Sequence, residues 1–183
     1  MKEVSQLTMA EYVYELRIPK NRVAVLIGKN GEVKKRLEST TEVKIEVDSE
    51  EGDCLLKGED ALALFTMLEV VRAIGRGFNP DTAMMLFKQD YVFDVISLGE
   101  FSKNGIARAR GRVIGEKGKC RETIETLTDS QISVYGKTIC IIGRAEKVTL
   151  ARRAIENLLK GNSHGSVYSW LERQRRTMRH EFY

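Results

Sequence analysis

Two stretches of alternating apolar and polar residues lie in the first half of the chain, with apolar faces of helical spacing between and after them. Residues 11–18 alternate up to Pro19, and residues 42–47 alternate again, which predicts half-buried strands. Apolar residues three and four positions apart predict helices elsewhere. The elements predicted for this half are a strand at 11–18, helices at 22–27 and 32–39, strands at 42–47 and 54–56, and a helix at 60–74.

The same order of elements recurs in the second half. Each half reads strand, helix, helix, strand, strand, helix, and this mixture within one unit predicts an α+β fold. The elements predicted for the second half are a strand at 91–98, helices at about 105–114 and 119–127, strands at 131–135 and 138–142, and a helix at 145–160.

A glycine tetrad occupies the same place in both halves. Gly28-Lys29-Asn30-Gly31 and Gly115-Glu116-Lys117-Gly118 are 87 positions apart (115 − 28), and an aliphatic pair precedes each, Leu26-Ile27 or Val113-Ile114. Residues on both sides of the tetrad match at the same offset. An offset of this length is too long for a solenoid repeat and fits a small domain used twice. We interpret the chain as a tandem duplication.

Charge separates the two copies. Residues 1–80 hold 12 Lys and Arg against 14 Asp and Glu, whereas residues 81–183 hold 18 against 12, so the net charges are −2 and +6. Seven basic residues and a single acid, Glu116, lie between Lys103 and Arg121, in a stretch where the second copy also has eight extra residues before its tetrad. An anionic partner is therefore expected to prefer the second copy.

The length and the composition limit the classes of protein to which the chain can belong. The chain of 183 residues suits two units of roughly 80 residues. Cys54, Cys120 and Cys140 form no CxxC pair and fit neither a disulfide nor a zinc framework, so we expect buried thiols in a reducing compartment. No apolar run reaches the ~18 residues of a membrane span, and no signal peptide is recognisable. We expect a soluble, cytoplasmic protein without a metal or cofactor.

The tetrads have the composition of phosphate-binding loops. Two glycines with two polar residues between them, set between helices, leave room for a sugar-phosphate backbone to approach the chain. The helix ends beside such a loop present backbone N–H groups. The aliphatic pair before each loop, together with Ile132 of a later strand in the second copy, is expected to form an apolar floor for bases. A single GxxG motif is weak evidence for a nucleic-acid-binding loop. Its recurrence between the same predicted elements makes that evidence stronger.

The order strand–helix–GxxG–helix–strand–strand–helix resembles that of a type I KH domain. The resemblance implies an α+β chain of two tandem type I KH domains followed by a C-terminal helix, each domain a β-α-α-β-β-α unit with a three-stranded antiparallel sheet packed on three helices. It also implies that each tetrad holds about four nucleotides of single-stranded RNA or DNA. The predicted bounds are 8–79 for the first domain, 80–89 for a linker, 90–161 for the second domain and 162–183 for a helical tail.

The second copy is predicted to be the stronger RNA-binding site, because acidic residues interrupt the basic run of the first. Glu116 departs from the basic residue usual at its position, which leaves Lys117 available to a phosphate. The RNA-binding residues predicted in the second copy are Arg108, Arg110, Arg112, Val113, Ile114, Gly115, Glu116, Lys117, Gly118, Lys119, Arg121 and Ile132. Those predicted in the weaker first copy are Leu26, Ile27, Gly28, Lys29, Asn30, Gly31, Lys34 and Lys35.

The tail has a helical pattern, with its apolar residues on one face and its arginines mostly on others. Two interpretations stay open. One is a terminal helix docked on the body by Trp170, and the other is a helix whose arginines contact RNA or a protein partner. The apolar face comprises Val167, Trp170, Leu171 and Met178, and the arginines are Arg173, Arg175, Arg176 and Arg179.

The tandem arrangement, the linker Asn79-Pro80-Asp81 and the segment Gly165-Ser166-Val167-Tyr168 together resemble one family over residues 8–175. This family is the archaeal pre-rRNA-processing KH proteins, which are related to the eukaryotic partner-of-Nob ribosome-assembly protein. The resemblance implies binding to the 3′ end of small-subunit rRNA, in ribosome biogenesis or translation initiation. It implies two protein partners as well, the Nob endonuclease and the alpha subunit of initiation factor two.

Nothing in the sequence predicts catalysis. The only histidines, His164 and His180, lie in the tail, and the glycine loops lack the Lys-Ser/Thr pair of a P-loop. No cluster with metal-ligand spacing is found. The predicted function is therefore RNA binding through KH loops. The alternative is an assembly adaptor whose main partner is a protein and whose RNA contact is secondary.

Overall fold

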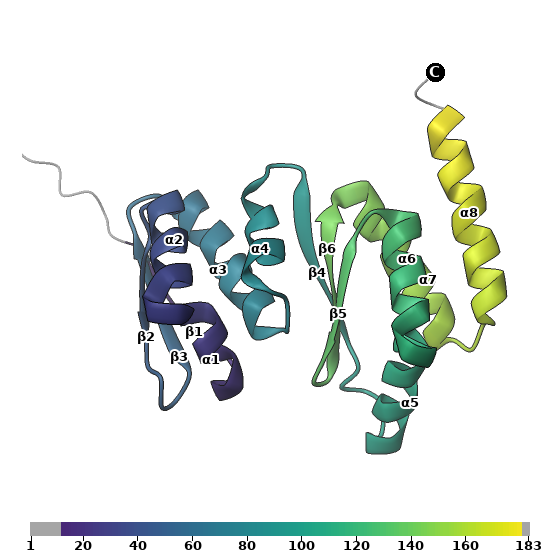
Figure 1. Ribbon diagram of the computed structural model, residues 1–183, viewed down its shortest axis with the longest axis horizontal. Helices are drawn as coiled ribbons and strands as arrows, with labels where there is room; N and C mark the ends of the chain where they lie inside the picture. Colours follow the sequence, from purple (N-terminus) through teal and green to yellow (C-terminus); the bar gives the residue numbers. More distant parts are fainter. Residues whose placement is uncertain (1–11, 181–183) are drawn as a thin grey trace, which may run out of the picture. The chain divides into compact units, whose positions relative to one another are not determined.

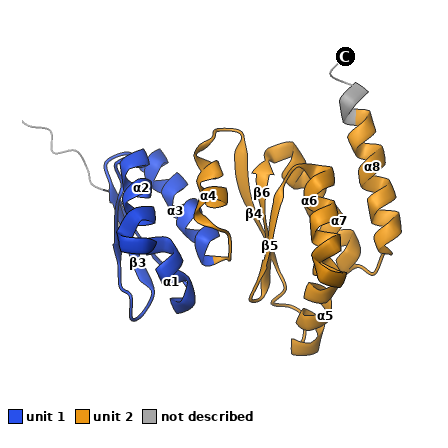
Figure 2. Ribbon diagram, viewed as in Figure 1, with its two compact units in different colours: residues 1–75 blue, residues 76–183 orange. Residues whose placement is uncertain are grey.

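The structure is a computed structural model that describes residues 12–180, with side chains up to Thr177. The chain divides after Gly75 into two compact units (Figure 2). Some sequence predictions fall outside the described residues, namely the start of the first domain at residue 8 and the side chains of Met178 and Arg179.

The first unit is a three-stranded antiparallel sheet with three helices (Figure 1). Its elements are β1 (Tyr12–Arg17), α1 (Lys20–Ile27), the 3-10 turn η1 (Lys29–Gly31), α2 (Glu32–Thr41), β2 (Lys44–Val47), β3 (Asp53–Gly58) and α3 (Ala61–Gly75). The strand order is β1-β3-β2, so the last strand is central. The element order predicted from the sequence is confirmed.

Alternation along the central strand decides which face of this sheet is covered. Cys54, Leu56 and Gly58 of β3 are buried, and the residues between them are half-buried. Their cross-strand neighbours include Leu16 on β1 and Ile45 on β2, so the same face continues across all three strands. The apolar helix α3 packs on β1 and β3 and closes the core.

The second unit repeats this arrangement and adds helices at both ends. Its elements are α4 (Pro80–Ala83), the 3-10 turn η2 (Met84–Phe87), β4 (Tyr91–Ser97), α5 (Lys103–Ile114), the 3-10 turn η3 (Glu116–Gly118), α6 (Lys119–Thr128), β5 (Gln131–Tyr135), β6 (Thr138–Arg144), α7 (Ala145–Leu159) and α8 (His164–His180). The strand order is β4-β6-β5, again antiparallel with the last strand in the centre.

The segment predicted as a linker begins with a helical turn of its own. The Asn79 side chain accepts a hydrogen bond from the Thr82 N–H at 2.7 Å, and Pro80 occupies the first helical position of α4. Both residues are favoured at such a helix start. The residue bounds predicted for the two domains, the linker and the tail stay a prediction.

The extra residues of the second copy form the loop before α5 and lengthen that helix, which has 12 residues where α1 has 8. Leu98 anchors the loop: its side chain is fully buried, and its N–H donates to the Lys137 carbonyl at 2.8 Å. The Ser102 hydroxyl oxygen then caps α5 by accepting a hydrogen bond from the Gly105 N–H at 3.2 Å. The insertion is therefore an ordered part of the second unit.

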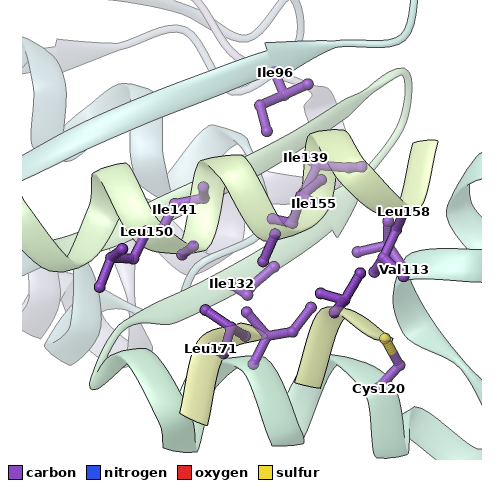
Figure 3. Packing of buried hydrophobic residues seen from close by; sticks show 14 of the residues in the cluster. Ile96, Val113, Cys120, Ile132, Ile139, Ile141, Leu150, Ile155, Leu158 and Leu171 are labelled. Atoms are coloured by element: carbon purple, nitrogen blue, oxygen red, sulfur yellow. The ribbon is translucent and has the colours of Figure 1, made fainter. Parts of the chain in front are cut away.

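One apolar cluster joins the strands and helices of the second unit (Figure 3). Ile139 and Ile141 of β6 are fully buried in it, together with Ile155 and Leu158 of α7 and Val113 of α5. Full burial of such side chains contributes about 1.5–3 kcal/mol each. The cluster fixes α5, and with it the chain that leads into the second glycine tetrad.

The C-terminal helix α8 packs on α6 and α7 and belongs to the same unit. Val167 and Leu171 are buried in the cluster, whereas Trp170 is only half-buried at its margin. Two aliphatic residues four positions apart share a helix face, so they dock α8. The expectation of a docked terminal helix is met, but its main contacts come from Val167 and Leu171 rather than from Trp170.

Candidate nucleic-acid interface

The two glycine tetrads adopt the same backbone conformation. In the first loop (Gly28–Gly31), φ is +74° at Gly28, +54° at Asn30 and +77° at Gly31. In the second loop (Gly115–Gly118), the corresponding angles are +72°, +51° and +83°. Each loop ends one helix and starts the next, so the first-turn N–H groups of α2 and α6 adjoin it. No side-chain cap bonds them.

The first glycine of each loop is required by the fold. A Cβ at Gly115 would lie 2.6 Å from the Cβ of Cys120 and 2.9 Å from its backbone nitrogen. At Gly28 the same atom would lie 2.5 Å from Val33 Cγ2 and 2.9 Å from the Val33 nitrogen. These distances are below van der Waals contact with parts of the chain that cannot move aside. The first glycine therefore lets the loop fold back on its second helix.

The second glycine of each loop faces open space. A Cβ at Gly118 would meet nothing within 4 Å, and at Gly31 it would meet only the end of the Lys35 side chain at 3.9 Å. Its positive φ suits glycine, but no neighbouring atom requires the missing side chain. The open backbone at this position is where a phosphate can approach.

Exposed cations lie in the second loop and along the helices on either side of it, and most of them form no ion pair with neighbouring acids. Lys103, Arg108, Lys117 and Lys119 are exposed, and within the described part of the chain none of them forms an ion pair. Arg121 is exposed too and has a 3.6 Å ion pair with Glu125. Glu116 is exposed beside them.

Arg110 differs from its exposed neighbours on α5. Its side chain is half-buried, and its Nε is buried without a hydrogen-bond partner among the described residues. A buried hydrogen-bond donor without a partner raises the free energy of the folded protein. A phosphate contact of Arg110 would supply this donor with an acceptor, and that contact stays a prediction.

Arg112 has a structural partner instead of a free guanidinium. Its Nε donates to the Leu158 carbonyl at 2.7 Å, and its Nη2 donates to the carbonyls of Gly161 and Asn162 at 2.8 and 2.6 Å. The last carbonyls of a helix have no partner within it, and a cation there also opposes the helix dipole. We therefore revise the expectation that Arg112 contacts RNA phosphate, because it holds the end of α7.

The predicted apolar floor is only partly accessible. Leu26 and Val113 are fully buried, and Ile132 is 4% exposed, so these three side chains belong to the cores. Ile27 and Ile114, the second members of the aliphatic pairs, are half-buried. Contact with a base stays a prediction, for which Ile27 and Ile114 are better placed, since core packing covers the other three residues.

The first loop has fewer free cations. Lys29, Asn30 and Lys35 are exposed or half-buried at the loop surface, whereas Lys34 is half-buried with its Nζ 3.9 Å from Glu38 Oε1. The helix before this loop has no basic residue in its last turn. The geometry of the two loops is thus alike, and their electrostatics differ.

A repeated carboxylate ties each loop helix to the following strand. Glu38 Oε1 accepts a hydrogen bond from the Ile45 N–H at 2.9 Å, and Glu125 Oε1 accepts one from the Ile132 N–H at 2.7 Å. Burial raises the pKa of Glu125, while the Ile132 hydrogen bond and Arg121 oppose that shift. The sequence repeat shows that a glutamate occupies this position in both copies, but it does not reveal that the carboxylate accepts a hydrogen bond from the following strand.

A thiol and a phenol lie behind the second loop. Burial, the largest cause, raises the pKa of the Cys120 thiol and that of the Tyr168 phenol, the latter to about 12. The His164 Nε2 donates to the Arg112 carbonyl at 2.8 Å, since a carbonyl only accepts. Tyr168 and His164 are the residues of this neighbourhood that sequence reasoning missed, because their partners lie more than 40 positions away.

The described residues form neither a metal-ion cluster nor a membrane-spanning helix. No group of three or more His, Cys, Asp or Glu side chains suited to a metal ion occurs among them. None of the helices in residues 12–180 is both long enough and apolar enough to cross a membrane.

Sequence comparison supports the interpretation of both loops. A model of the KH domain matches residues 13–65, and the model of the second KH domain of PNO1, a eukaryotic type KH-domain (KH-domain type I), matches residues 92–176. The KH domain-containing protein MJ0443 of Methanocaldococcus jannaschii is 46% identical over 170 residues, which cover 90% of this chain and 74% of that protein.

Further similarity is found in eukaryotes and in a solved structure. The pre-rRNA-processing protein PNO1 of Gibberella zeae is 29% identical over 147 residues, 78% of this chain and 54% of that protein. In a crystal structure of an a/eIF2alpha–aDim2p–rRNA complex from Pyrococcus horikoshii OT3, a chain of 42% identity matches with a TM-score of 0.86 and covers 91% of this chain and 96% of its own. With two tandem KH domains and these relatives, the chain belongs to the family of KH-domain proteins that includes archaeal Dim2p and the eukaryotic pre-rRNA-processing protein PNO1.

Proposed function

We propose that this protein binds single-stranded RNA through its KH loops, and that the RNA is the 3′ end of small-subunit rRNA during ribosome biogenesis. The observation that carries the proposal is the second loop, where Gly118 faces open space between the unpaired cations Lys117 and Lys119. An rRNA complex of a relative and the pre-rRNA-processing role in the name of another support the choice of RNA.

Within this proposal, the second loop makes the stronger contact. Lys117, Lys119 and Arg121 face the phosphates next to the loop, and Arg108 extends the basic surface along α5. The apolar side chain of Ile114 contacts a base. The first loop repeats the geometry with Lys29 and Lys35 only, so it contributes less affinity.

The test uses fluorescence anisotropy with a short single-stranded RNA of the small-subunit 3′ end. Gly118→Asp introduces a carboxylate where phosphate approaches, and Gly118→Asn introduces the same shape without charge. Both residues tolerate positive φ, and the open space admits their side chains. We expect Gly118→Asp to abolish most of the affinity and Gly118→Asn to lower it less.

The matched pair Gly31→Asp and Gly31→Asn provides the comparison between copies. If the second loop binds RNA more strongly than the first, Gly31→Asp should lower the RNA affinity less than Gly118→Asp does. Equal losses of affinity would refute this ranking of the two loops. A wild-type protein that does not bind this RNA at low salt would refute the proposed function itself.

A second candidate function is assembly with a protein partner, and the first unit offers the observation that favours it. Tyr12, Val13 and Tyr14 of the edge strand β1 are 47%, 51% and 45% exposed, and Leu62 and Phe65 of α3 are 73% and 53% exposed. Five of the seven large apolar side chains that are exposed among the described residues lie in this unit, which makes it the better candidate for contact with a protein. The relative of known structure is in complex with the alpha subunit of an initiation factor, which is the partner we propose, with the Nob endonuclease as a second.

Replacing Leu62 and Phe65 with serine tests this candidate. We expect the double variant to lose binding to the purified initiation factor subunit while its RNA affinity stays within about twofold of wild type, because these apolar side chains make no phosphate contact. Loss of both activities without unfolding would argue against separate surfaces. Unchanged binding of the subunit would remove this surface from the proposal.

We further propose that the protein acts as a binding protein rather than an enzyme and that it works in the cytoplasm. The three cysteines are free and buried, as is usual in a reducing compartment. The family provides RNA-binding KH proteins as relatives. Incubation of labelled precursor RNA with the purified protein should leave the RNA intact, and cleavage would contradict the proposal.

A further inference from the structure

Among the residues whose side chains are described, the arginines of α8 form no side-chain hydrogen bond. Arg173, Arg175 and Arg176 lie on the outer part of the helix, and no ion pair among the described residues involves them. Figure 1 shows the later turns of α8 continuing past the end of α6. Glu172 lies beside them on α8, so the four side chains together carry a net charge of +2, which attracts an anionic partner.

The start of α8 is fixed to the helix that leads into the second loop. Arg112 of α5 bonds the carbonyls of Leu158, Gly161 and Asn162 in the turn before α8, and His164, the first residue of α8, donates to the Arg112 carbonyl. Arg112 lies three residues before Gly115. One guanidinium thus sets the position of α8 relative to the second loop.

The course of α8 extends the basic surface of that loop. Tyr168 packs against the apolar cluster that contains Cys120 at the start of α6, and Leu171 is buried in the same cluster as Ile124 of α6. The two helices therefore run side by side in the same direction from the loop. With a rise of 1.5 Å per residue, the arginines lie about 14–18 Å along α8 from its first residue.

We propose that the exposed arginines of α8, namely Arg173, Arg175 and Arg176, form a second RNA-binding surface that holds the phosphates of single-stranded RNA flanking the segment in the second loop. The proposal rests on the proposed function, because the loop supplies the anchored end of the RNA. The tie at Arg112 keeps the two surfaces in a fixed arrangement. RNA that extends past the loop therefore gains phosphate contacts without any movement of the protein.

The test compares RNAs of about 4, 8 and 12 nucleotides, within the range of single-strand site sizes, extended on either side of the segment that binds the loop. The variant replaces Arg173, Arg175 and Arg176 with glutamine. For the longer RNAs we expect tighter binding by wild type than for the shortest one. The triple variant should lose that gain, and its slope of log affinity against log salt should fall in magnitude by about 2, since each phosphate that is no longer neutralised lowers it by about 0.7.

The control is a triple glutamine variant of Arg72, Lys147 and Arg153, which removes the same charge from α3 and α7. It should leave the length dependence unchanged, and circular dichroism should show both variants folded. Equal salt slopes for wild type and the α8 variant would overturn the inference while the proposed function stands. Loss of binding to the initiation factor subunit with RNA binding intact would assign the surface to a protein and overturn it too. A wild type that binds none of the RNAs would refute the proposed function.

Discussion

A lysine occupies a left-handed backbone position in the second loop. Lys117 has φ +51° and ψ +27°, whereas the matching residue of the first loop, Asn30, has φ +54° and ψ +26°. Asparagine tolerates this conformation and most other side chains do not. The second copy therefore keeps a cation at the tip of its loop despite a conformational cost, which is consistent with a phosphate-binding role for Lys117.

Lys117→Asn should stabilise the second unit and weaken RNA binding. We expect the free energy of unfolding to rise by about 1 kcal/mol because the strain at residue 117 is relieved, and the affinity for RNA to fall because the ammonium group no longer meets a phosphate. Urea unfolding followed by the fluorescence of Trp170, the single tryptophan of the chain, measures the first effect. Asn30→Lys is the converse control, and a stability gain there would contradict the argument.

Gly115→Ala should disrupt the second unit, while Gly118→Ala should not. The new methyl group at 115 meets Cys120 at 2.6 Å, whereas that at 118 meets nothing. We expect about 1–2 kcal/mol of destabilisation for Gly118→Ala from its positive φ alone, and a larger loss for Gly115→Ala. Thermal unfolding monitored at Trp170 distinguishes them, and equal melting temperatures would mean that the loop relaxes around residue 115.

Residue types and spacing identify the loop glycines and their cations, but not which residues are free to bind. The sequence predicts that Val113 and Ile132 contact bases, although both are in the core. An apolar residue suits a core position and a base-contacting position equally well, so residue type does not distinguish the two. Arg112 reads as one more loop cation because its acceptors, at 158 to 162, become neighbours only in three dimensions. Packing decides these assignments, and a single sequence does not encode it in a local pattern.

At the scale of elements, the same carboxylate bond joins helix to strand in both units. Glu38 and Glu125 accept from the N–H groups of Ile45 and Ile132 in their neighbouring strands. Both strands lie at the edges of their sheets, where such N–H groups have few alternative acceptors. The bond thereby fixes how the helix after each loop sits on the sheet.

Glu125→Ala should destabilise the second unit by about 1–3 kcal/mol, since it leaves the Ile132 N–H unpaired in a buried place. Glu125→Gln keeps an acceptor oxygen and should cost less. Burial raises the pKa of Glu125 above its usual 4.5, so the folded protein binds this proton more tightly than the unfolded chain. The resulting stabilisation appears as pH falls through the raised pKa towards 4.5 and is absent at neutral pH.

Unfolding curves between neutral and mildly acidic pH test the sign of this effect. The difference in free energy of unfolding between wild type and Glu125→Gln should move in favour of wild type as pH falls. A difference that moves the opposite way would show that the hydrogen bond and Arg121 outweigh burial at this carboxyl.

The elements were predictable because glycine and proline mark their ends and alternation distinguishes strand from helix. The predicted helix at 119–127 and strand at 131–135, for instance, match α6 and β5 to within one residue. The strand order does not follow from local residue patterns, since which strand takes the centre depends on pairing between distant segments. Asn79-Pro80 is a helix-start signal, yet the pattern of two tandem domains predicts a linker there.

At the scale of the whole molecule, each compact unit has its own reporter of unfolding. Cys54 is buried in the first unit, where burial raises its pKa to about 11. Trp170 lies in the second unit, whose larger size, residues 76–183 against residues 1–75, and added helix α8 predict greater stability.

Alkylation of Cys54 should therefore become rapid at a lower urea concentration than the Trp170 transition. Mass spectrometry of peptides after a short pulse of iodoacetamide assigns the modified cysteine, and Cys120 and Cys140 should react together with the Trp170 change. Coincident transitions for all three thiols would show that the two units unfold as one cooperative body.

The open space above the second glycine of each loop has an evolutionary consequence. Because a Cβ at Gly31 or Gly118 meets few atoms of the protein, a duplicated domain can change the charge of its loop with little change in packing. At the first glycine of each loop, any side chain would collide with the next helix, so this residue has to stay glycine. Both copies therefore keep the shape of the loop while the ligand that each loop prefers can change. Two copies with the same backbone and opposite net charge are the outcome expected from such a history.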